Sequence, residues 1–145
     1  MEPRPKIDNA MELEAARIVA EKIGRGATAE AIADHYSYPM DGYDLAKQLD
    51  RHEFWDTTRA EMEILDEMDV FVSRAERKAE KEWFERNRPK PPFAIGTRIQ
   101  WRDITGEITG ISEHGHGKYL VKPDVSTIGD GRYLVNFEDA QPIAR

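Results

Sequence analysis

The residues best suited to metal chemistry lie in one short glycine-rich stretch, His114-Gly115-His116-Gly117. Two histidines separated by one residue can both reach a single metal ion when the loop is tight, with Glu113 or a distant residue as third ligand. The same stretch has the glycines that a hairpin turn favours, because glycine adopts positive φ at little cost. We therefore expect a turn without a bound metal or cofactor, and keep a metal site at His114 and His116 as the alternative.

Five carboxylates that could act in acid–base catalysis lie close together in the chain: Glu61, Glu63, Asp66, Glu67 and Asp69. Helical spacing predicts that they face solvent, where nothing would shift their pKa values as catalysis requires. His35 and His52 are single histidines at predicted helix ends, and the sequence has no nucleophile motif or phosphate-binding glycine loop. The absence of cysteine excludes thiol catalysis. We predict that the protein is not an enzyme.

Three short helices are expected in the first part of the chain, over residues 10–23, 29–35 and 42–52. Asn9 is the predicted N-cap of the first helix, with Glu12 completing a capping box. Gly24 and Gly26 end this helix, and Thr28 is the predicted N-cap of the second.

A long helix is expected over residues 57–88, with Asp56 as its cap. Apolar residues recur at close to every 3.5 positions from Met62 to Trp83, as in a helix that packs lengthwise on another helix. Acidic residues crowd the first half of this helix and basic residues the second, which suits the helix dipole. The narrow apolar stripe leaves open a homodimer formed through this helix.

The chain changes character after this helix. Three prolines predict a stiff connector over residues 89–93, and apolar and polar residues then alternate as in short strands. The predicted strands are Thr97–Trp101, Glu107–Ser112, Lys118–Lys122, Arg132–Phe137 and Gln141–Ala144, with a bulge at Gly110. A small closed or half-closed barrel would protect the edges of such a sheet. The predicted fold class is α+β, with a helical region over residues 1–88 and a five-stranded barrel over residues 94–145.

Four stretches of the C-terminal region resemble an SH3-like small barrel of the KOW or Tudor kind: Gly96–Trp101, Gly106–Ile111, Tyr119–Lys122 and Tyr133–Glu138. The resemblance covers residues 94–145 alone, and its motif is generic. It implies a fold whose members bind proteins, peptides or nucleic acid. The chain as a whole also resembles small phage-encoded proteins.

The charge and composition of the chain disfavour nucleic acid and membranes as partners. The 145 residues include 28 acidic and 21 basic side chains, a net charge of −7, which disfavours non-specific binding to nucleic acid. No run of residues is apolar enough to span a membrane, and the N-terminal segment lacks an apolar signal core. Together with the absence of cysteine, these features predict a cytoplasmic protein without membrane attachment.

A non-catalytic protein that binds a basic protein partner fits these features. The acidic half of the long helix would steer the partner, and two aromatic residues would anchor it. The predicted contact residues are Phe54, Trp55, Glu61, Glu63, Asp66, Glu67 and Asp69. Basic partners often bind nucleic acid, so a phage-encoded inhibitor of a host defence protein is consistent with this interpretation.

The alternative is a nucleic-acid-binding protein that uses the barrel. Aromatic residues lie near five basic residues in the chain, as in barrels that bind single strands: Arg98, Arg102, Lys118, Lys122 and Arg132. Trp101 and Tyr133 are nonetheless predicted to face the barrel core. Leu120 and Leu134 are predicted on the opposite, outward face, where they would form a docking surface.

Overall fold

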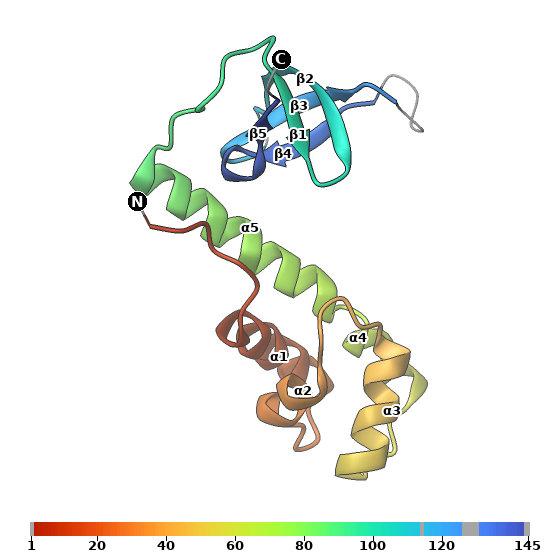
Figure 1. Cartoon of the computed structure of the whole chain (residues 1–145). Coiled ribbons are helices and arrows are strands. Elements are labelled where there is room, and N and C mark those ends of the chain that lie inside the picture. The colour runs from red at the N-terminus through yellow and green to blue at the C-terminus, as the bar shows by residue number, and fades with distance from the viewer. Residues whose placement is uncertain (1, 114, 126–130, 144–145) are drawn as a thin grey trace. The chain divides into compact units, whose positions relative to one another are not determined.

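The computed structural model describes residues 2–113, 115–125 and 131–143, and its fold is of the α+β class (Figure 1). Within these residues, five α-helices precede five short strands that form one antiparallel sheet. No helix in the described residues is apolar over the length that a membrane crossing requires. The chain divides into two compact units. The helical unit comprises residues 3–80, and the sheet unit joins Glu2 to the chain from Lys81 onward.

The helical unit begins with three short helices: α1 (Asn9–Ile23), α2 (Ala29–His35) and α3 (Gly42–Glu53). Thr28 caps α2, as predicted. The cap of α1 is Asp8, whose carboxylate accepts from the Met11 N–H at 2.9 Å, so the prediction of Asn9 as cap and Glu12 as its capping-box partner is wrong. Asn9 and Glu12 instead line a pocket between α1 and α2.

The single helix predicted over residues 57–88 is corrected by the structure, which has two helices here: α4 (Arg59–Leu65) and α5 (Met68–Asn87). The break contains no proline or glycine. The Asp66 carboxylate accepts from the Gly42 N–H at 2.7 Å, and this long-range bond supports the turn between the helices. A Cβ on Gly42 would lie 2.6 Å from the Asp66 nitrogen, so glycine is needed for this approach. A homodimer through the helix stays a prediction.

The start of α4 is held by a reciprocal pair of hydrogen bonds. The Thr58 hydroxyl accepts from the Glu61 N–H at 3.1 Å, and the Glu61 carboxylate accepts from the Thr58 N–H at 2.9 Å. This is a capping box, which satisfies two of the N–H groups that a helix start leaves unpaired. The cap is therefore Thr58, and the prediction of Asp56 is wrong.

One apolar core holds the helical unit together, and each of its helices contributes to it. Five side chains, one from each helix, are fully buried there: Val19, Ile32, Leu49, Leu65 and Met68. Burying an aliphatic side chain of this size stabilises a fold by about 1.5–3 kcal/mol. This packing fixes α1 against α2, and the pocket is built on those two helices.

The sheet unit contains five strands: β1 (Arg98–Trp101), β2 (Ile104–Ile111), β3 (Lys118–Pro123), β4 (Tyr133–Asn136) and β5 (Gln141–Pro142). The five predicted strands are confirmed, although Ala144 lies outside the described residues. The register between β2 and β3 shifts between Ile108 and Gly110, which confirms the predicted bulge. The strand order is β4-β3-β2-β1-β5, with a short 3-10 helix, η1 (Phe137–Asp139), before β5. Among the described residues β4 and β5 do not pair, so the sheet is not closed.

One face of the sheet packs into a second apolar core, which includes Ile99, Ile108 and Tyr119. The alternation of buried and exposed residues along β3 and β4 matches the predicted inward and outward faces. The Tyr119 hydroxyl accepts from the Phe93 N–H at 2.8 Å and lies 3.2 Å from the Phe93 carbonyl, to which it donates. The connector before β1 is thereby tied to the core.

Glu2 belongs to the sheet unit because it binds the last turns of α5. The Trp83 indole Nε1–H donates to the Glu2 carbonyl at 2.7 Å, and Trp83 is buried. The Glu2 carboxylate accepts from Arg86 at 3.0 Å and from Asn87 at 2.9 Å. Residues 81–87 of α5 are thus counted with the sheet unit, and the predicted connector over residues 89–93 stays a prediction.

Candidate functional site: an acidic pocket in the helical unit

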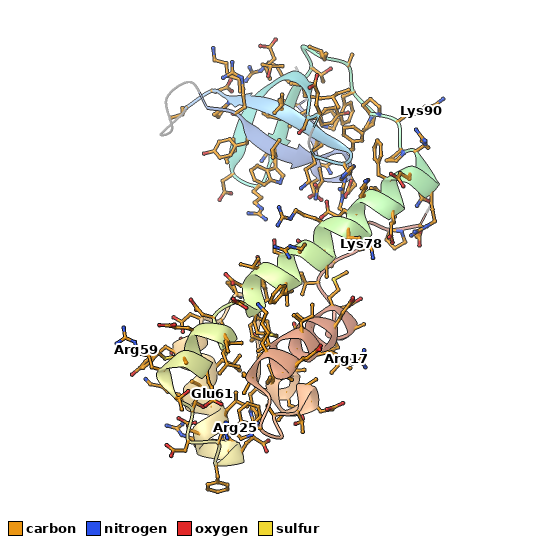
Figure 2. The ribbon with its side chains drawn as sticks, turned by 180° about the vertical axis from the view of Figure 1, so that it is seen from behind. Arg17, Arg25, Arg59, Glu61, Lys78 and Lys90 are labelled. Atoms are coloured by element: carbon orange, nitrogen blue, oxygen red, sulfur yellow. The ribbon has the colours of Figure 1, made fainter. Side chains whose placement is uncertain are left out.

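Glu61, one of the predicted partner-binding acids, is buried and bonded within the helical unit. Its carboxylate forms a two-point ion pair with the Arg25 guanidinium, in which Nη2 lies 3.1 Å from Oε1 (Figure 2). Hydrogen bonds from Arg25 and from the Thr58 N–H lower the pKa of Glu61 to about 2. Arg25 also donates to the Trp55 carbonyl at 2.9 Å. Glu61 therefore stays ionised and fixes the loop after α1 against α4.

The two acids between α4 and α5 also have partners within the helical unit. Asp66 accepts from the Gly42 N–H, as described for the turn. The Glu67 carboxylate lies 2.8 Å from the Lys22 ammonium of α1. The charge of Glu67 is therefore partly neutralised inside the unit, and the Asp66 carboxylate is held by a backbone hydrogen bond.

The remaining predicted acids lie in different surroundings. Glu63 is exposed on α4, and its carboxylate lies 3.8 Å from the Arg59 guanidinium one turn earlier. Asp69, at the start of α5, is half-buried and near enough to Tyr36 to raise the pKa of its hydroxyl. Asp69 thus belongs with Tyr36 and the residues around it.

The two predicted aromatic anchors differ sharply in exposure. Phe54 follows α3 in the left-handed region, at φ 57°, and its side chain is 86% exposed. Trp55 is half-buried against the helical core. Left-handed backbone is unfavourable for a bulky residue, and an exposed phenyl ring gains nothing from burial. Phe54 is consequently a residue that folding alone does not explain.

The ends of α2 and α3 meet through two histidines. The imidazole rings of His35 and His52 stack with centroids 5.1 Å apart, and His35 Nε2 lies 3.2 Å from the Glu53 carboxylate. This contact places the end of α3, which leads into Phe54, beside the end of α2, which carries Asp34.

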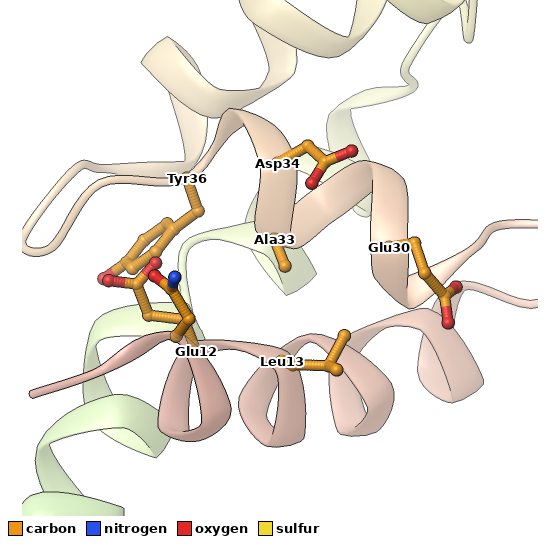
Figure 3. Close-up of a pocket in the computed structure, with 7 residues that line it drawn as sticks. Glu12, Leu13, Glu30, Ala33, Asp34 and Tyr36 are labelled. Carbon is orange, nitrogen blue, oxygen red and sulfur yellow. The ribbon is translucent and has the colours of Figure 1, made fainter.

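A pocket of about 420 Å³ lies between α1 and α2 (Figure 3). Each helix contributes residues three and four positions apart, which share one helix face. The lining residues are Asn9, Glu12, Leu13, Glu30, Ala33, Asp34 and Tyr36. In Figure 3, Glu12 and Tyr36 lie at one end and Glu30 at the other, with Leu13 and Ala33 between them. We call this feature the acidic pocket.

Three carboxylates line the acidic pocket: Glu12 is half-buried, and Glu30 and Asp34 are exposed. In the described part of the chain, Glu12, Glu30 and Asp34 form no ion pair with a basic side chain. Burial raises the pKa of Glu12, and the nearby Asp8 carboxylate raises it further. Both effects disfavour the charged form of Glu12, so a cation that entered the pocket would relieve them.

Tyr36 closes one end of the acidic pocket with its side chain only 5% exposed. Its hydroxyl has no hydrogen-bond partner in the described residues. Burial raises the pKa of Tyr36, and the negative charges of Asp69 and Glu12 raise it further. The hydroxyl therefore stays protonated, and it can both accept a hydrogen bond and donate one.

The chemistry of the acidic pocket is suited to binding a cation. Its lining offers carboxylate, amide and phenol oxygens as acceptors, and apolar surface from Leu13 and Ala33. The described lining residues include no histidine, serine or lysine that could act as a nucleophile or a titrating base near neutral pH. An acidic, partly apolar slot matches a basic side chain, whose stem is apolar and whose end is charged.

The acidic pocket was not among the features that the sequence predicted. Glu12 was interpreted as a capping residue, and Glu30, Asp34 and Tyr36 were not considered. One signal was present: Glu30 and Asp34 are like charges four residues apart on a seven-residue helix. Such a pair destabilises a helix, and no base follows at the same spacing to compensate.

Four of the five predicted nucleic-acid-binding residues lie on the outward face of the sheet. Arg98 is on β1, Lys118 and Lys122 are on β3, and Arg132 precedes β4 in phase with the outward Leu134. Acids share this face. Glu107 lies between Arg98 and Lys122 in the register, and the Arg98 guanidinium pairs with the Asp124 carboxylate, with Nη1 3.0 Å from Oδ1. The face is thus basic with acids interleaved.

Arg102 lies apart from these four, in the turn between β1 and β2. Its guanidinium sits over the Trp101 ring, 4.8 Å from the centroid. Trp101 in turn contacts Tyr133, with ring centroids 5.9 Å apart. Both aromatic side chains are half-buried against the sheet core, on the inward face that their alternation predicted.

The histidine pair His114 and His116 is described only in part, because His114 lies outside the described residues. The His116 ring contacts Phe84 at the end of α5, with centroids 5.6 Å apart. No group of three or more metal-ligating side chains gathers anywhere in the described residues.

Comparison with known proteins adds no relative: no protein-family model, no curated protein and no solved structure matches this chain.

Proposed function

We propose that the protein is a non-catalytic binding protein whose helical unit holds a basic segment of a partner protein in the acidic pocket. The observation that carries this proposal is the set of three lining carboxylates, Glu12, Glu30 and Asp34, which no basic side chain of the described chain neutralises. Burial and the Asp8 carboxylate raise the pKa of Glu12, so a positively charged partner would stabilise its charged form, and the exposed Glu30 and Asp34 would attract such a partner.

Phe54 extends the proposed contact surface. The contact between His35 and Glu53 brings the segment that leads into Phe54 beside Asp34 of the acidic pocket. Exposed aromatic residues are enriched among the side chains that dominate binding energy in interfaces. The partner would thus place a basic residue in the pocket and an apolar patch against the Phe54 ring. Glu61, Asp66 and Glu67 would support the fold of this surface and would not contact the partner.

An inhibitory role is consistent with such a contact. Basic segments of proteins commonly bind nucleic acid through phosphate contacts. A protein that occupies such a segment would compete with nucleic acid for it. The resemblance to small phage-encoded proteins supports a host protein as the target, and we propose this as the biological setting.

A binding assay with a defined probe tests the proposal. A fluorescently labelled, 15-residue peptide rich in arginine and lysine is titrated with the full chain at 50 mM and 500 mM salt, and its anisotropy is measured. We expect binding that weakens at high salt, because charges attract the peptide. The triple variant Glu12→Gln, Glu30→Gln and Asp34→Asn should lose roughly tenfold or more in affinity.

A matched control separates the acidic pocket from net charge. Glu14, Glu21 and Glu82 are exposed acids that line no part of the pocket, and replacing all three by glutamine changes the net charge equally. This control should bind as the wild type does. Equal losses in the two triple variants would show that only net charge matters and would refute the proposed site. Phe54→Ala should weaken binding to a partner that covers this ring without lowering stability.

A second candidate function is binding of single-stranded nucleic acid on the sheet. It is favoured by the placement of Arg98, Lys118, Lys122 and Arg132 on one outward face. The interleaved Glu107 and Asp124 weaken it. A gel-shift assay with a labelled 20-nucleotide strand at low salt decides the matter: no shift at micromolar protein would exclude this function.

The fold of the sheet unit fits the SH3-like resemblance, and we include it in the proposal. Five short strands follow one another, β5 returns to pair with β1, and β2 is bent by a bulge at Gly110. Such bends let a small sheet curve towards a barrel. The proposal concerns the fold alone and assigns no ligand to the sheet.

A further inference from the structure

The Tyr36 hydroxyl is a buried polar group without a partner in the described residues. Burying a hydroxyl without a hydrogen bond costs free energy, so native structures seldom keep one unless it has another use. Tyr36 lines the acidic pocket, with its hydroxyl end next to Glu12 in Figure 3. A ligand that hydrogen-bonds to this oxygen would remove the cost, and Tyr36 therefore indicates what kind of ligand fits.

The shape of the acidic pocket restricts the ligand further. Leu13 and Ala33 lie between the end formed by Glu12 and Tyr36 and the end formed by Glu30 (Figure 3). A ligand that follows this surface must be apolar along its length and carry its donors at its tip. Long basic side chains have this form, because a flexible apolar stem carries a charged group at its end.

Arginine and lysine differ in how many hydrogen bonds they could donate to Glu12 and Tyr36 at the closed end of the acidic pocket. A guanidinium has five N–H donors in one plane, so it can donate to the Glu12 carboxylate and to the Tyr36 oxygen together. The Tyr36 oxygen, which has no partner within the described residues, would then accept one hydrogen bond from the ligand. A lysine ammonium is a compact charge that binds water strongly. Removing this water to place the ammonium beside a buried phenol costs free energy.

We infer that the acidic pocket binds one arginine side chain of the partner, with its guanidinium between Glu12 and Tyr36 and its stem on Leu13 and Ala33. This inference rests on the proposed function and adds the residue type to it. Glu30 and Asp34 attract the basic residues that flank this arginine in the partner. The partner is thus recognised by one arginine at a defined position, beyond its overall charge.

Three blocked tripeptides test the inference: Gly-Arg-Gly, Gly-Lys-Gly and Gly-citrulline-Gly. Citrulline has nearly the shape of arginine and no charge. The methyl signals of Leu13 and Ala33 are followed by NMR as each tripeptide is added to the full chain. We expect saturable shifts with the arginine tripeptide, with a dissociation constant roughly fivefold to tenfold lower than for lysine. The citrulline tripeptide should give no saturable shift.

The variant Tyr36→Phe removes the hydroxyl and keeps the ring. It should raise the dissociation constant of the arginine tripeptide roughly fivefold to tenfold and leave that of the lysine tripeptide unchanged. Tyr43→Phe is the matched control, because Tyr43 is exposed on α3 and lines no part of the pocket. The melting temperature of the unliganded Tyr36→Phe variant should not fall, whereas a purely structural hydroxyl would give a fall.

The outcomes separate the inference from the proposed function. Equal binding of arginine and lysine tripeptides, or a Tyr36→Phe variant that binds as the wild type does, would overturn the arginine assignment. If binding of the 15-residue peptide still requires Glu12, Glu30 and Asp34, the proposed function stands without the arginine assignment. If neither tripeptide shifts the methyl signals and the long peptide binds the triple variant normally, both are refuted.

Discussion

Each unit of the chain buries one tyrosine, and the two hydroxyls differ in their hydrogen bonds. In the sheet unit, the Tyr119 hydroxyl both accepts from and donates to the backbone of Phe93. In the helical unit, the Tyr36 hydroxyl has no partner within the described residues. Burial raises the pKa of both hydroxyls, so both stay protonated. The difference separates a tyrosine whose hydroxyl stabilises its unit from one whose hydroxyl, in our proposal, binds a ligand.

Two arginine–carboxylate pairs, one from each unit, differ in how far their side chains are exposed. The Arg25–Glu61 pair joins the loop after α1 to the start of α4, and Glu61 is buried. The Arg98–Asp124 pair lies on the outward face of the sheet with both side chains well exposed. Buried charges must be paired, whereas exposed pairs contribute little to stability. The helical unit thus uses a buried acid to hold its fold, and the comparison predicts which substitutions will lower stability.

The largest effect is expected for Tyr119→Phe in the sheet unit. The substitution removes two hydrogen bonds and leaves the Phe93 N–H and carbonyl without their partner. We expect a loss of about 2 kcal/mol in the free energy of unfolding of the sheet unit. Hydrogen exchange of β2 and β3 under native conditions measures this loss. Unchanged protection of these strands would contradict a structural role for Tyr119.

The next effect in size is expected for Glu61→Ala in the helical unit. It removes the capping box with Thr58 and the carboxylate that holds Arg25. The Thr58 hydroxyl still caps the helix, and the loss of the hydrogen bond from the Thr58 N–H to the carboxylate alone costs about 1 kcal/mol. Glu63→Ala is the control on the same helix, since Glu63 is exposed. Urea unfolding followed by helix content measures both, and equal stabilities for the two variants would be inconsistent with the internal role of Glu61.

The contribution of Glu61 should also depend on pH. Its pKa in the folded chain is about 2, below the ordinary value of 4.5. A depressed pKa means that the folded state favours the charged form, so the stabilisation is present above about pH 5 and is lost as the pH falls towards 2. The stability difference between the wild type and Glu61→Gln should therefore shrink over this range. A difference that stays constant down to pH 2 would contradict the account.

The sequence predicted the short elements well because local signals specify them. Thr28 caps α2 as expected, and the alternation of β3 and β4 separated buried from exposed residues correctly. The break between α4 and α5 could not be predicted in this way. Residues 66–67 are ordinary helix formers without glycine or proline, and a bond between Asp66 and Gly42, which are far apart in sequence, accompanies the turn. Tertiary contacts override helix propensity here.

The partners of the predicted contact acids could not be read from the sequence, for the same physical reason. Glu61 and Glu67 looked like neighbours on a solvated helix face, but Arg25 and Lys22 reach them from α1 and its following loop. Conversely, Glu12 looked like a capping residue, and only the packing of α1 on α2 places it beside Tyr36. A pocket made by two helices has no signature in either helix alone, apart from uncompensated like charges.

A smaller change in the free energy of unfolding, and one of opposite sign, is expected for Tyr36→Phe. Removing a buried hydroxyl that has no partner should raise the free energy of unfolding of the unliganded protein by up to about 1 kcal/mol. Substitutions that improve stability at the expense of binding are typical of functional sites. Thermal unfolding measures the change, with Tyr43→Phe as control. A clear loss of stability would place Tyr36 with Tyr119 as a structural residue and remove the contrast between the units.

The smallest effect is expected for Asp124→Asn in the sheet unit. Arg98 loses an ion pair there, but both groups are exposed and solvent screens the pair. The melting temperature should stay within the scatter of repeated measurements at 150 mM salt. A pronounced fall would mean that the outward face of the sheet is organised around this pair, contrary to the comparison.

The central claim is that the helical unit, and not the sheet unit, binds a basic partner. Hydrogen exchange of the full chain with and without the saturating 15-residue peptide tests it most directly, because a ligand protects the region whose folded state it binds. We predict slower exchange in α1 and α2, with β1 to β4 unchanged. Protection of the sheet strands with no change in α1 and α2 would contradict the account.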